Sequence, residues 1–207
     1  MDTKKIITRA KSILLAPSAE WPVIAAETDT VAGLYVGYIL ALAALPALVR
    51  FVSLSLIGVS VPFLGAYRVG IGAGLTAAAL SYVLSLVGVY AVALIVEALA
   101  PTFSAEKNRL QALKTVAYAY TASWVLSLVG IIPGLAVLAG LAGAAYSLYL
   151  LKSGLPITMK CPPEKALGYT AVTMIVAIVM AIVLNLVVGS MAGGLGINRA
   201  LLGLTGR

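Results

Sequence analysis

The chain contains several long, nearly uncharged apolar runs, and each run is long enough to cross a lipid bilayer. They lie at about residues 31–49, 69–98, 113–132, 135–151 and 169–191. A helix of about 20 apolar residues spans the hydrocarbon core of a membrane. Because 62% of the 207 residues are hydrophobic and only 10% are charged, much apolar surface must face something other than water. The sequence therefore predicts an all-α, polytopic integral membrane bundle with about five transmembrane helices.

The positions of the basic residues indicate how such a bundle is oriented. With five spans and the N-terminus inside, the outer segments carry only Arg68, Arg199 and Arg207, with Arg50 at the outer boundary. The inner segments carry the other basic residues, which are Lys4, Lys5, Arg9, Lys11, Lys107, Arg109, Lys114, Lys152, Lys160 and Lys165. Cytoplasmic segments of membrane proteins are enriched in Lys and Arg. We therefore predict a cytoplasmic N-terminus and an extracytoplasmic C-terminus.

Three regions follow from this topology: a cytoplasmic segment (1–30), a transmembrane domain (31–193) and a short extracytoplasmic tail (194–207). Residues 3–15 have the pattern of an amphipathic helix, whose apolar side comprises Ile6, Ile7, Ala10, Ile13 and Leu14. Such a helix lies in the headgroup plane of a membrane, with its basic residues toward anionic lipid, here Lys4, Lys5, Arg9 and Lys11. The alternative is a first helix packed on the cytoplasmic face of the protein itself. Trp21 is predicted to anchor the next segment at the membrane interface.

Two features of the spans leave alternatives open. Residues 51–67 are apolar but interrupted by Ser, Gly and Pro, so they extend the first helix, re-enter the membrane or lie on it. Small residues in the fourth span form two rows at helical spacing, Ala136/Gly140/Ala144 and Ala139/Gly143/Ser147. Small residues allow close contact between membrane helices. We expect these rows, with Gly140 at the centre of the first, to pack within the chain; the alternative is a homodimer seam.

Ionisable or amide side chains inside a membrane are candidates for function. Arg50 lies at the outer end of the first span and Glu97 at the inner end of the second, so a direct ion pair between them is not expected. Glu97 is expected to meet Lys107, Arg109, Lys114 or water; a proton-relay role is the alternative. Asn185 is the only amide at membrane depth, and we expect it to form an inter-helix hydrogen bond.

The sequence lacks most of the residue types on which enzyme active sites depend. It contains no histidine. Its single cysteine, Cys161, lies beside Lys160 and Lys165; we expect it to have no functional role, the alternative being a thiol whose pKa these lysines lower. Metal sites need clustered His, Cys or carboxylates, and nucleophile activation needs a base such as His. We therefore expect neither catalysis nor a cofactor or metal. The net charge of +7 is dispersed over short loops, so we expect no nucleic acid partner.

Several segments resemble the prokaryotic branch of the Yip family, the Ypt/Rab-interacting membrane proteins. Pro17, Trp21 and Glu27 resemble the stretch before that family's first span, and Tyr118 and Tyr120 its tyrosine-bearing segment. The region joining the last two spans adds Leu155, Pro156, Pro163, Lys165, Ala166 and Tyr169. The resemblance covers nearly the whole chain and implies five spans, a cytoplasmic N-terminus and the plasma membrane of a prokaryote. Eukaryotic relatives act in vesicle traffic, binding small GTPases and shaping membranes; that activity does not follow for this chain.

Two functional hypotheses remain. The first is a non-enzymatic, membrane-organising or scaffold protein whose partners are anionic lipids, a second copy of the chain or another membrane protein. It rests on the amphipathic helix and the small-residue rows. The second is a small transporter or channel, supported by Arg50, Glu97, Asn185 and residues 51–67. Transporters usually contain paired broken helices from repeated halves, and no internal repeat is evident here.

Overall fold

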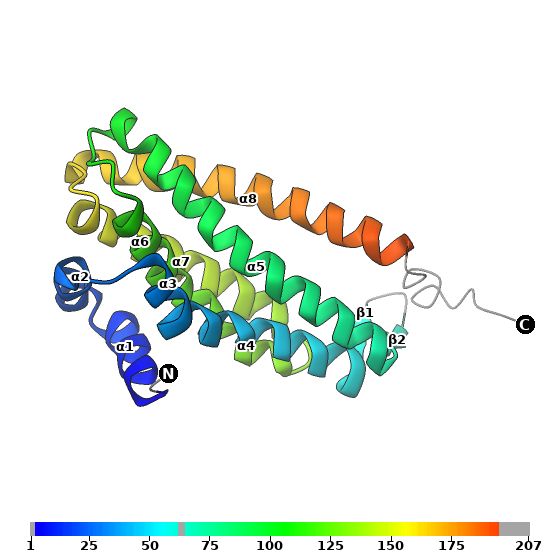
Figure 1. Ribbon diagram of the computed structural model, residues 1–207. Helices are drawn as coiled ribbons and strands as arrows, with labels where there is room; N and C mark the ends of the chain where they lie inside the picture. The colour runs from blue at the N-terminus through cyan, green and yellow to red at the C-terminus, as the bar shows by residue number, and fades with distance from the viewer. Residues whose placement is uncertain (1–2, 62–64, 195–207) are drawn as a thin grey trace, which may run out of the picture.

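A computed structural model describes residues 3–61 and 65–194. In this part of the chain, five long helical segments lie side by side in an elongated bundle (Figure 1). The first is continuous from α3 (Val31–Leu34) through π-helix η1 (Tyr35–Ile39) and α4 (Leu40–Phe51) to π-helix η2 (Val52–Ile57). The others are α5 (Ile71–Leu99) with 3-10 helix η3 (Ala100–Phe103), α6 (Arg109–Leu126) with 3-10 helix η4 (Ser127–Ile131), α7 (Ala136–Thr158) and α8 (Pro163–Gly194). The predicted all-α membrane bundle is confirmed.

Four of these segments are long and apolar enough to cross a membrane. They are Val31–Ile57, Ile71–Phe103, Ala136–Thr158 and Pro163–Met180, and between 22% and 33% of each most apolar window is buried inside the protein. Most of their surface is therefore available to lipid. The segment α6 differs, because it carries polar residues and is enclosed by α4, α5 and α7. Its partners cover it, so it needs no apolar surface facing lipid.

Residues 51–67 extend the first helix and then form a hairpin. The helix continues to Ile57 and stops at Gly58, whose φ of +92° is a left-handed conformation that glycine adopts without strain. Strands β1 (Val59–Val61) and β2 (Gly65–Tyr67) follow and pair antiparallel, with Val59 opposite Tyr67. Of the three predicted alternatives, extension is therefore correct up to Ile57. We call this end of the bundle the hairpin end.

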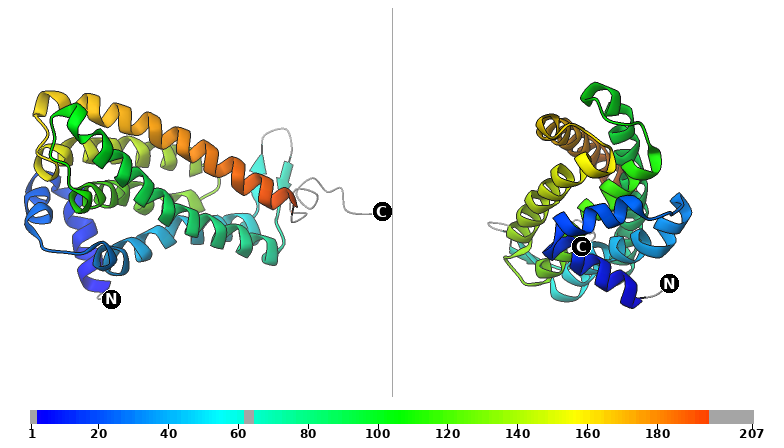
Figure 2. Two further views of the ribbon diagram at one scale, coloured as in Figure 1. Left: turned by 45° about the horizontal axis from the view of Figure 1, so that its top comes forward. Right: turned by 90° about the vertical axis from the view of Figure 1, so that its left-hand side faces the viewer.

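At the opposite end, α1 (Thr3–Leu15) and α2 (Pro17–Ala26) form a unit that we call the platform, residues 3–26. The end-on view shows α1 extended across the bundle axis (Figure 2). The predicted amphipathic helix is present, and Ile6, Ala10 and Ile13 are buried against the protein. The side of α1 that carries these three residues therefore packs on the protein itself, as in the second of the two predicted arrangements.

The two small-residue rows of α7 have different surroundings. In the second row, a Cβ on Gly143 would lie 3.0 Å from Cα of Ser123, and the Ser123 and Ser147 hydroxyls are 2.8 Å apart. This row forms the close contact between α6 and α7. In the first row, a Cβ on Gly140 would meet nothing within 4 Å, and Ala136, Gly140 and Ala144 are exposed. The expected intrachain packing of Gly140 is therefore wrong; its role in a homodimer stays a prediction.

Candidate functional site

Trp21 attaches the platform to the bundle. Its side chain is fully buried, and its indole N–H donates to the Ser153 hydroxyl over 3.0 Å. Gly154 provides the space, because a Cβ there would lie 2.7–2.9 Å from ring atoms of Trp21. The prediction that Trp21 is an anchor at the membrane interface is corrected by this burial, because Trp21 anchors α2 to α7. A tryptophan side chain, with its apolar ring and polar N–H, is suited both to a membrane interface and to a protein interior. Here the space left by Gly154 allows the ring to be buried in the protein.

The carboxyl end of α2 is capped by side chains from α6. The ammonium of Lys114 donates to the carbonyl oxygen of Ile24 over 2.9 Å and to that of Glu27, and the amide of Gln111 donates to Ala25 over 2.9 Å. The last carbonyls of a helix have no partner within the helix, so these donors satisfy them. Lys114 is only 1% exposed. The sequence placed Lys114 among the inner basic residues and missed this role, although a lysine inside an apolar run was a signal.

Ionic and hydroxyl contacts hold α1 against α2 and α7. Arg9 forms ion pairs with Glu20 and Glu27, and its side chain is 13% exposed. Burial by itself would lower the pKa of Arg9, but the Glu27 and Glu20 carboxylates outweigh it and raise the pKa. The Tyr146 hydroxyl of α7 donates to the carbonyl of Leu14 over 2.6 Å. Arg9 was predicted to face lipid; its charge is instead compensated within the platform.

The outward side of α1 is both basic and apolar. Lys4, Ile7, Lys11 and Leu15 fall on one face of the helix at spacings of three or four residues, and all four are exposed. The exposed fractions of Ile7 and Leu15 are 62% and 73%, which is high for large apolar side chains. Lys5 is exposed on a neighbouring part of the helix. The platform therefore presents lysines together with apolar side chains away from the bundle.

Glu97 and Arg109 form an ion pair of 2.9 Å between Oε2 and Nε, at the end of the bundle that carries the platform. This agrees with one of the contacts expected for Glu97. Cys161 lies near the same end and is 2% exposed. Its pKa is raised, first by burial and then by Glu164, while Lys165 opposes the shift. The alternative of a lowered thiol pKa therefore does not apply, because burial has a larger effect than the neighbouring lysine.

The tyrosines of α6 lie inside the bundle. The ring of Tyr118 is 5% exposed and packs against Tyr38 with centroids 4.5 Å apart, and Tyr120 stacks on Trp124. Tyr120 also borders a cavity of about 240 Å³ between α5, α6, α7 and α8. Asn185 belongs to α8, but its side chain lies outside the described residues, so its predicted hydrogen bond stays a prediction.

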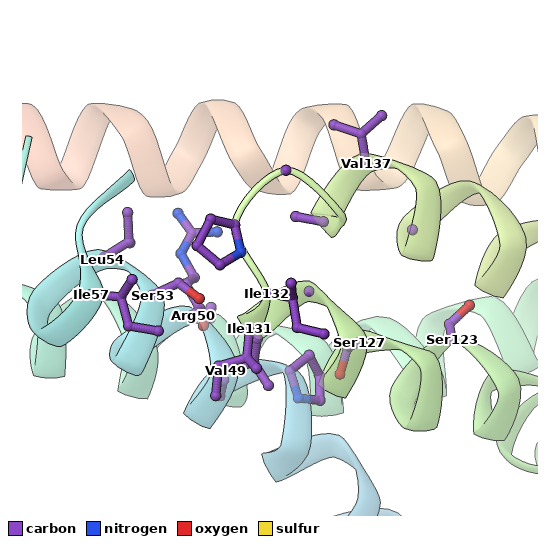
Figure 3. Close-up of a pocket in the computed structure, with 18 of the residues that line it drawn as sticks. Val49, Arg50, Ser53, Leu54, Ile57, Ser123, Ser127, Ile131, Ile132 and Val137 are labelled. Atoms are coloured by element: carbon purple, nitrogen blue, oxygen red, sulfur yellow. The ribbon is translucent and has the colours of Figure 1, made fainter. Parts of the chain in front are cut away.

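A larger pocket of about 700 Å³ lies toward the hairpin end (Figure 3). The first helical segment, α5, η4 and the start of α7 form its walls. Most of the lining is apolar; the polar side chains are those of Arg50, Ser53, Ser81, Ser85, Ser123 and Ser127. Arg50 is exposed, and no carboxylate pairs with it among the described residues. Arg50 and Glu97 thus lie toward opposite ends of the bundle, as predicted.

Comparison with known proteins identifies the family but no close relative. Neither the curated proteins nor the solved structures include a match to this chain. The sequence model of the Yip1 domain matches residues 11–185. This range includes α2 with Trp21 and all five long helical segments, except the end of α8. The match covers most of the chain and agrees with the apolar helical bundle. This chain therefore belongs to the Yip1 domain family of membrane proteins.

Proposed function

We propose that this protein is a non-enzymatic membrane-organising protein whose platform binds the anionic surface of the membrane that contains it. The observation that carries the proposal is the outward face of α1, where Lys4 and Lys11 alternate with Ile7 and Leu15. This combination is typical of helices that lie at a lipid headgroup layer. We assign the platform to the cytoplasmic side of a prokaryotic plasma membrane, because most basic residues lie at its end of the bundle.

The direction of α1 supports this proposal. The apolar segments of the bundle run along one axis, and α1 extends across that axis (Figure 2). If the bundle axis follows the membrane normal, α1 lies parallel to the membrane plane. Trp21, Lys114 and Tyr146 hold the platform in this position, so it need not be ordered when it meets lipid. A preorganised face loses little conformational entropy on binding.

Replacing Lys4, Lys5 and Lys11 together by Gln is expected to weaken the contact of α1 with anionic lipid. Each lysine near an anionic surface contributes about 1 kcal/mol, so the triple variant loses about 3 kcal/mol of attraction. The measurement uses the full chain in phosphatidylcholine liposomes containing phosphatidylglycerol, with a fluorophore on Ile7→Cys in a Cys161→Ser background. Quenching by headgroup-labelled nitroxide lipid should be strong with the native lysines and weak in the triple variant.

Membrane organisation requires a second readout, namely vesicle size and shape by electron cryomicroscopy. We expect the native protein to change the diameter distribution of anionic liposomes and the triple variant to lose this effect. The matched control replaces exposed lysines outside the platform, Lys152, Lys160 and Lys165, by Gln, and should behave as the native protein. Equal vesicle shapes with native protein, triple variant and no protein would reject the proposal, even if α1 is quenched.

The second candidate function, a small transporter or channel, is favoured by one observation, the pocket containing Arg50 and five serines. Tyr38 and Thr121, which precede the pocket residues Ala43 and Ser123 on their helices, are buried, with their hydroxyls 2.8 Å apart, and Tyr118 packs on Tyr38. We therefore expect sealed proteoliposomes to show no more movement of ions, protons or small solutes than empty liposomes. Flux that decreases on Arg50→Gln would replace the proposed function by transport.

A further inference from the structure

Arg50 is a cation that forms no ion pair with any residue the structure describes. The seven acidic residues of the chain are Asp2, Glu20, Glu27, Asp29, Glu97, Glu106 and Glu164. Those that the structure describes lie at the platform end, in or beside α2, at the connection from α5 to α6, and at the start of α8 (Figure 1). No Asp or Glu occurs between Asp29 and Glu97, so none can reach Arg50 from the hairpin. Within residues 3–61 and 65–194, Arg50 therefore has no carboxylate partner, and an anion from outside the chain can occupy that place.

The pocket wall provides a second donor beside Arg50. Ser53 lies one helical turn further on, and the two side chains are close together in the pocket (Figure 3). The Ser53 hydroxyl is buried and has no hydrogen-bond partner in the described part of the chain. Other serines of the lining already donate to backbone carbonyls, such as Ser85 to Tyr82 over 2.7 Å and Ser127 to Trp124 over 2.6 Å. Arg50 and Ser53 thus offer free donors to one anion.

The type of anion follows from the donors. A guanidinium presents several N–H groups in one plane, which match the oxygens of a phosphate or carboxylate. Ser53 belongs to the π-helix η2, and such segments frequently occur at functional sites. Together the two side chains are suited to an oxyanion.

Because the rest of the pocket lining is mostly apolar, it suits a ligand that also has an apolar portion. Its wall toward the platform is formed by Ala43, Pro46 and Ala47 of α4 and by Ala136, Val137 and Gly140 of α7. Val137 is 72% exposed, so the pocket opens on the surface that faces lipid. A volume of about 700 Å³ is much larger than inorganic phosphate requires and accommodates a headgroup with part of a hydrocarbon chain.

The position of Arg50 along its helix agrees with a lipid headgroup. From Val31 to Arg50 the helix rises about 28 Å at 1.5 Å per residue, which is close to the thickness of a hydrocarbon core of about 30 Å. We propose that this pocket binds an anionic phospholipid of the leaflet at the hairpin end. Its phosphate accepts hydrogen bonds from Arg50 and Ser53, and one acyl chain lies along the wall formed by α4 and α7.

The test is photolabelling of the full chain in phosphatidylcholine liposomes with phosphatidylglycerol carrying a diazirine in its acyl chain. Peptide mapping distinguishes labels on the pocket from labels on α1, so this result is independent of the proposed function. We expect labels on the pocket segments of α4 and α7. Arg50→Gln should reduce pocket labelling about tenfold, because a charge-assisted hydrogen bond is lost. Arg50→Lys should restore part of it, and Lys152→Gln, an exposed cation elsewhere, should have no effect.

A second variant tests the pocket without changing its charge. Gly140→Leu adds a side chain to the pocket lining at a position where a Cβ meets nothing within 4 Å, so it should fold normally and also reduce labelling. Equal pocket labelling in the native protein and both variants would overturn the proposal. Equal labelling by a diacylglycerol probe without phosphate would show a purely apolar site, and displacement by inorganic phosphate would show a site for the free anion; either result also overturns it.

Discussion

Trp21→Ala is expected to release the platform from the bundle and to lower its free energy of attachment by about 3–5 kcal/mol, the usual cost of removing a large aromatic side chain from a core. Trp21 is fully buried, and its ring packs so closely on Gly154 that a Cβ at that position would clash with it. Alanine would leave a cavity beside a glycine that has no side chain to fill it. It would also remove the hydrogen bond to Ser153.

Hydrogen exchange of the full chain in lipid nanodiscs measures this effect directly. Amides of residues 3–26 should exchange much faster in Trp21→Ala, while those of α5 and α6 should keep their protection. Trp21→Phe retains most of the packing and should have a smaller effect. The matched control is Trp124→Ala, which removes the other buried tryptophan of the chain. If residues 3–26 retain full protection in Trp21→Ala, the attachment of the platform does not depend on this contact.

Lys114→Met is expected to destabilise the attachment of the platform to the bundle by about 3 kcal/mol, because the variant leaves two backbone carbonyls without their charged donor. Methionine resembles lysine in length but cannot donate to the carbonyls of Ile24 and Glu27. The carboxyl end of α2 would then be buried with unpaired oxygens. The same hydrogen-exchange measurement should show the largest change in residues 20–27, next to the lost contacts.

The control for charge alone is Lys152→Met, at an exposed position of α7. A surface substitution of this kind changes stability by about 0.5 kcal/mol or less. Similar exchange in Lys114→Met and Lys152→Met would mean that the lysine cap contributes nothing to the platform. Both Trp21→Ala and Lys114→Met should also reduce the quenching of α1 by headgroup-labelled lipid, since a detached α1 no longer has a fixed orientation.

Much of the architecture could be predicted from the sequence, because a membrane-spanning helix is recognised from about 20 consecutive apolar residues and needs no knowledge of its partners. The apolar runs predicted the helical segments, and the charges between them indicated the ends at which the connections lie. The pattern of residues 3–15 predicted an amphipathic helix, and α1 has these residues. The resemblance carried by Trp21, Tyr118 and Tyr169 named the family that the Yip1 domain match then showed.

The candidate sites could not be predicted to the same extent. Trp21 was expected at the membrane interface and lies against Gly154. Arg9 was expected to face anionic lipid and pairs with Glu20 and Glu27. Lys114 was one basic residue among many and caps a helix 90 residues earlier in the chain. Each of these roles depends on a partner that is distant in sequence.

Hydropathy and charge in the sequence were sufficient to predict a membrane protein, its long apolar segments and the end of the bundle at which most basic residues lie. Which apolar faces meet protein and which meet lipid became evident only from the packed helices, as the two rows of α7 show. Lipid and protein interior are both apolar, so hydropathy cannot distinguish them. The distinction arises from shape. Gly143 allows α6 to approach α7 closely, Gly154 leaves room for the Trp21 ring, and Gly140 stays open beside a pocket whose Arg50 has no ion-pair partner among the described residues.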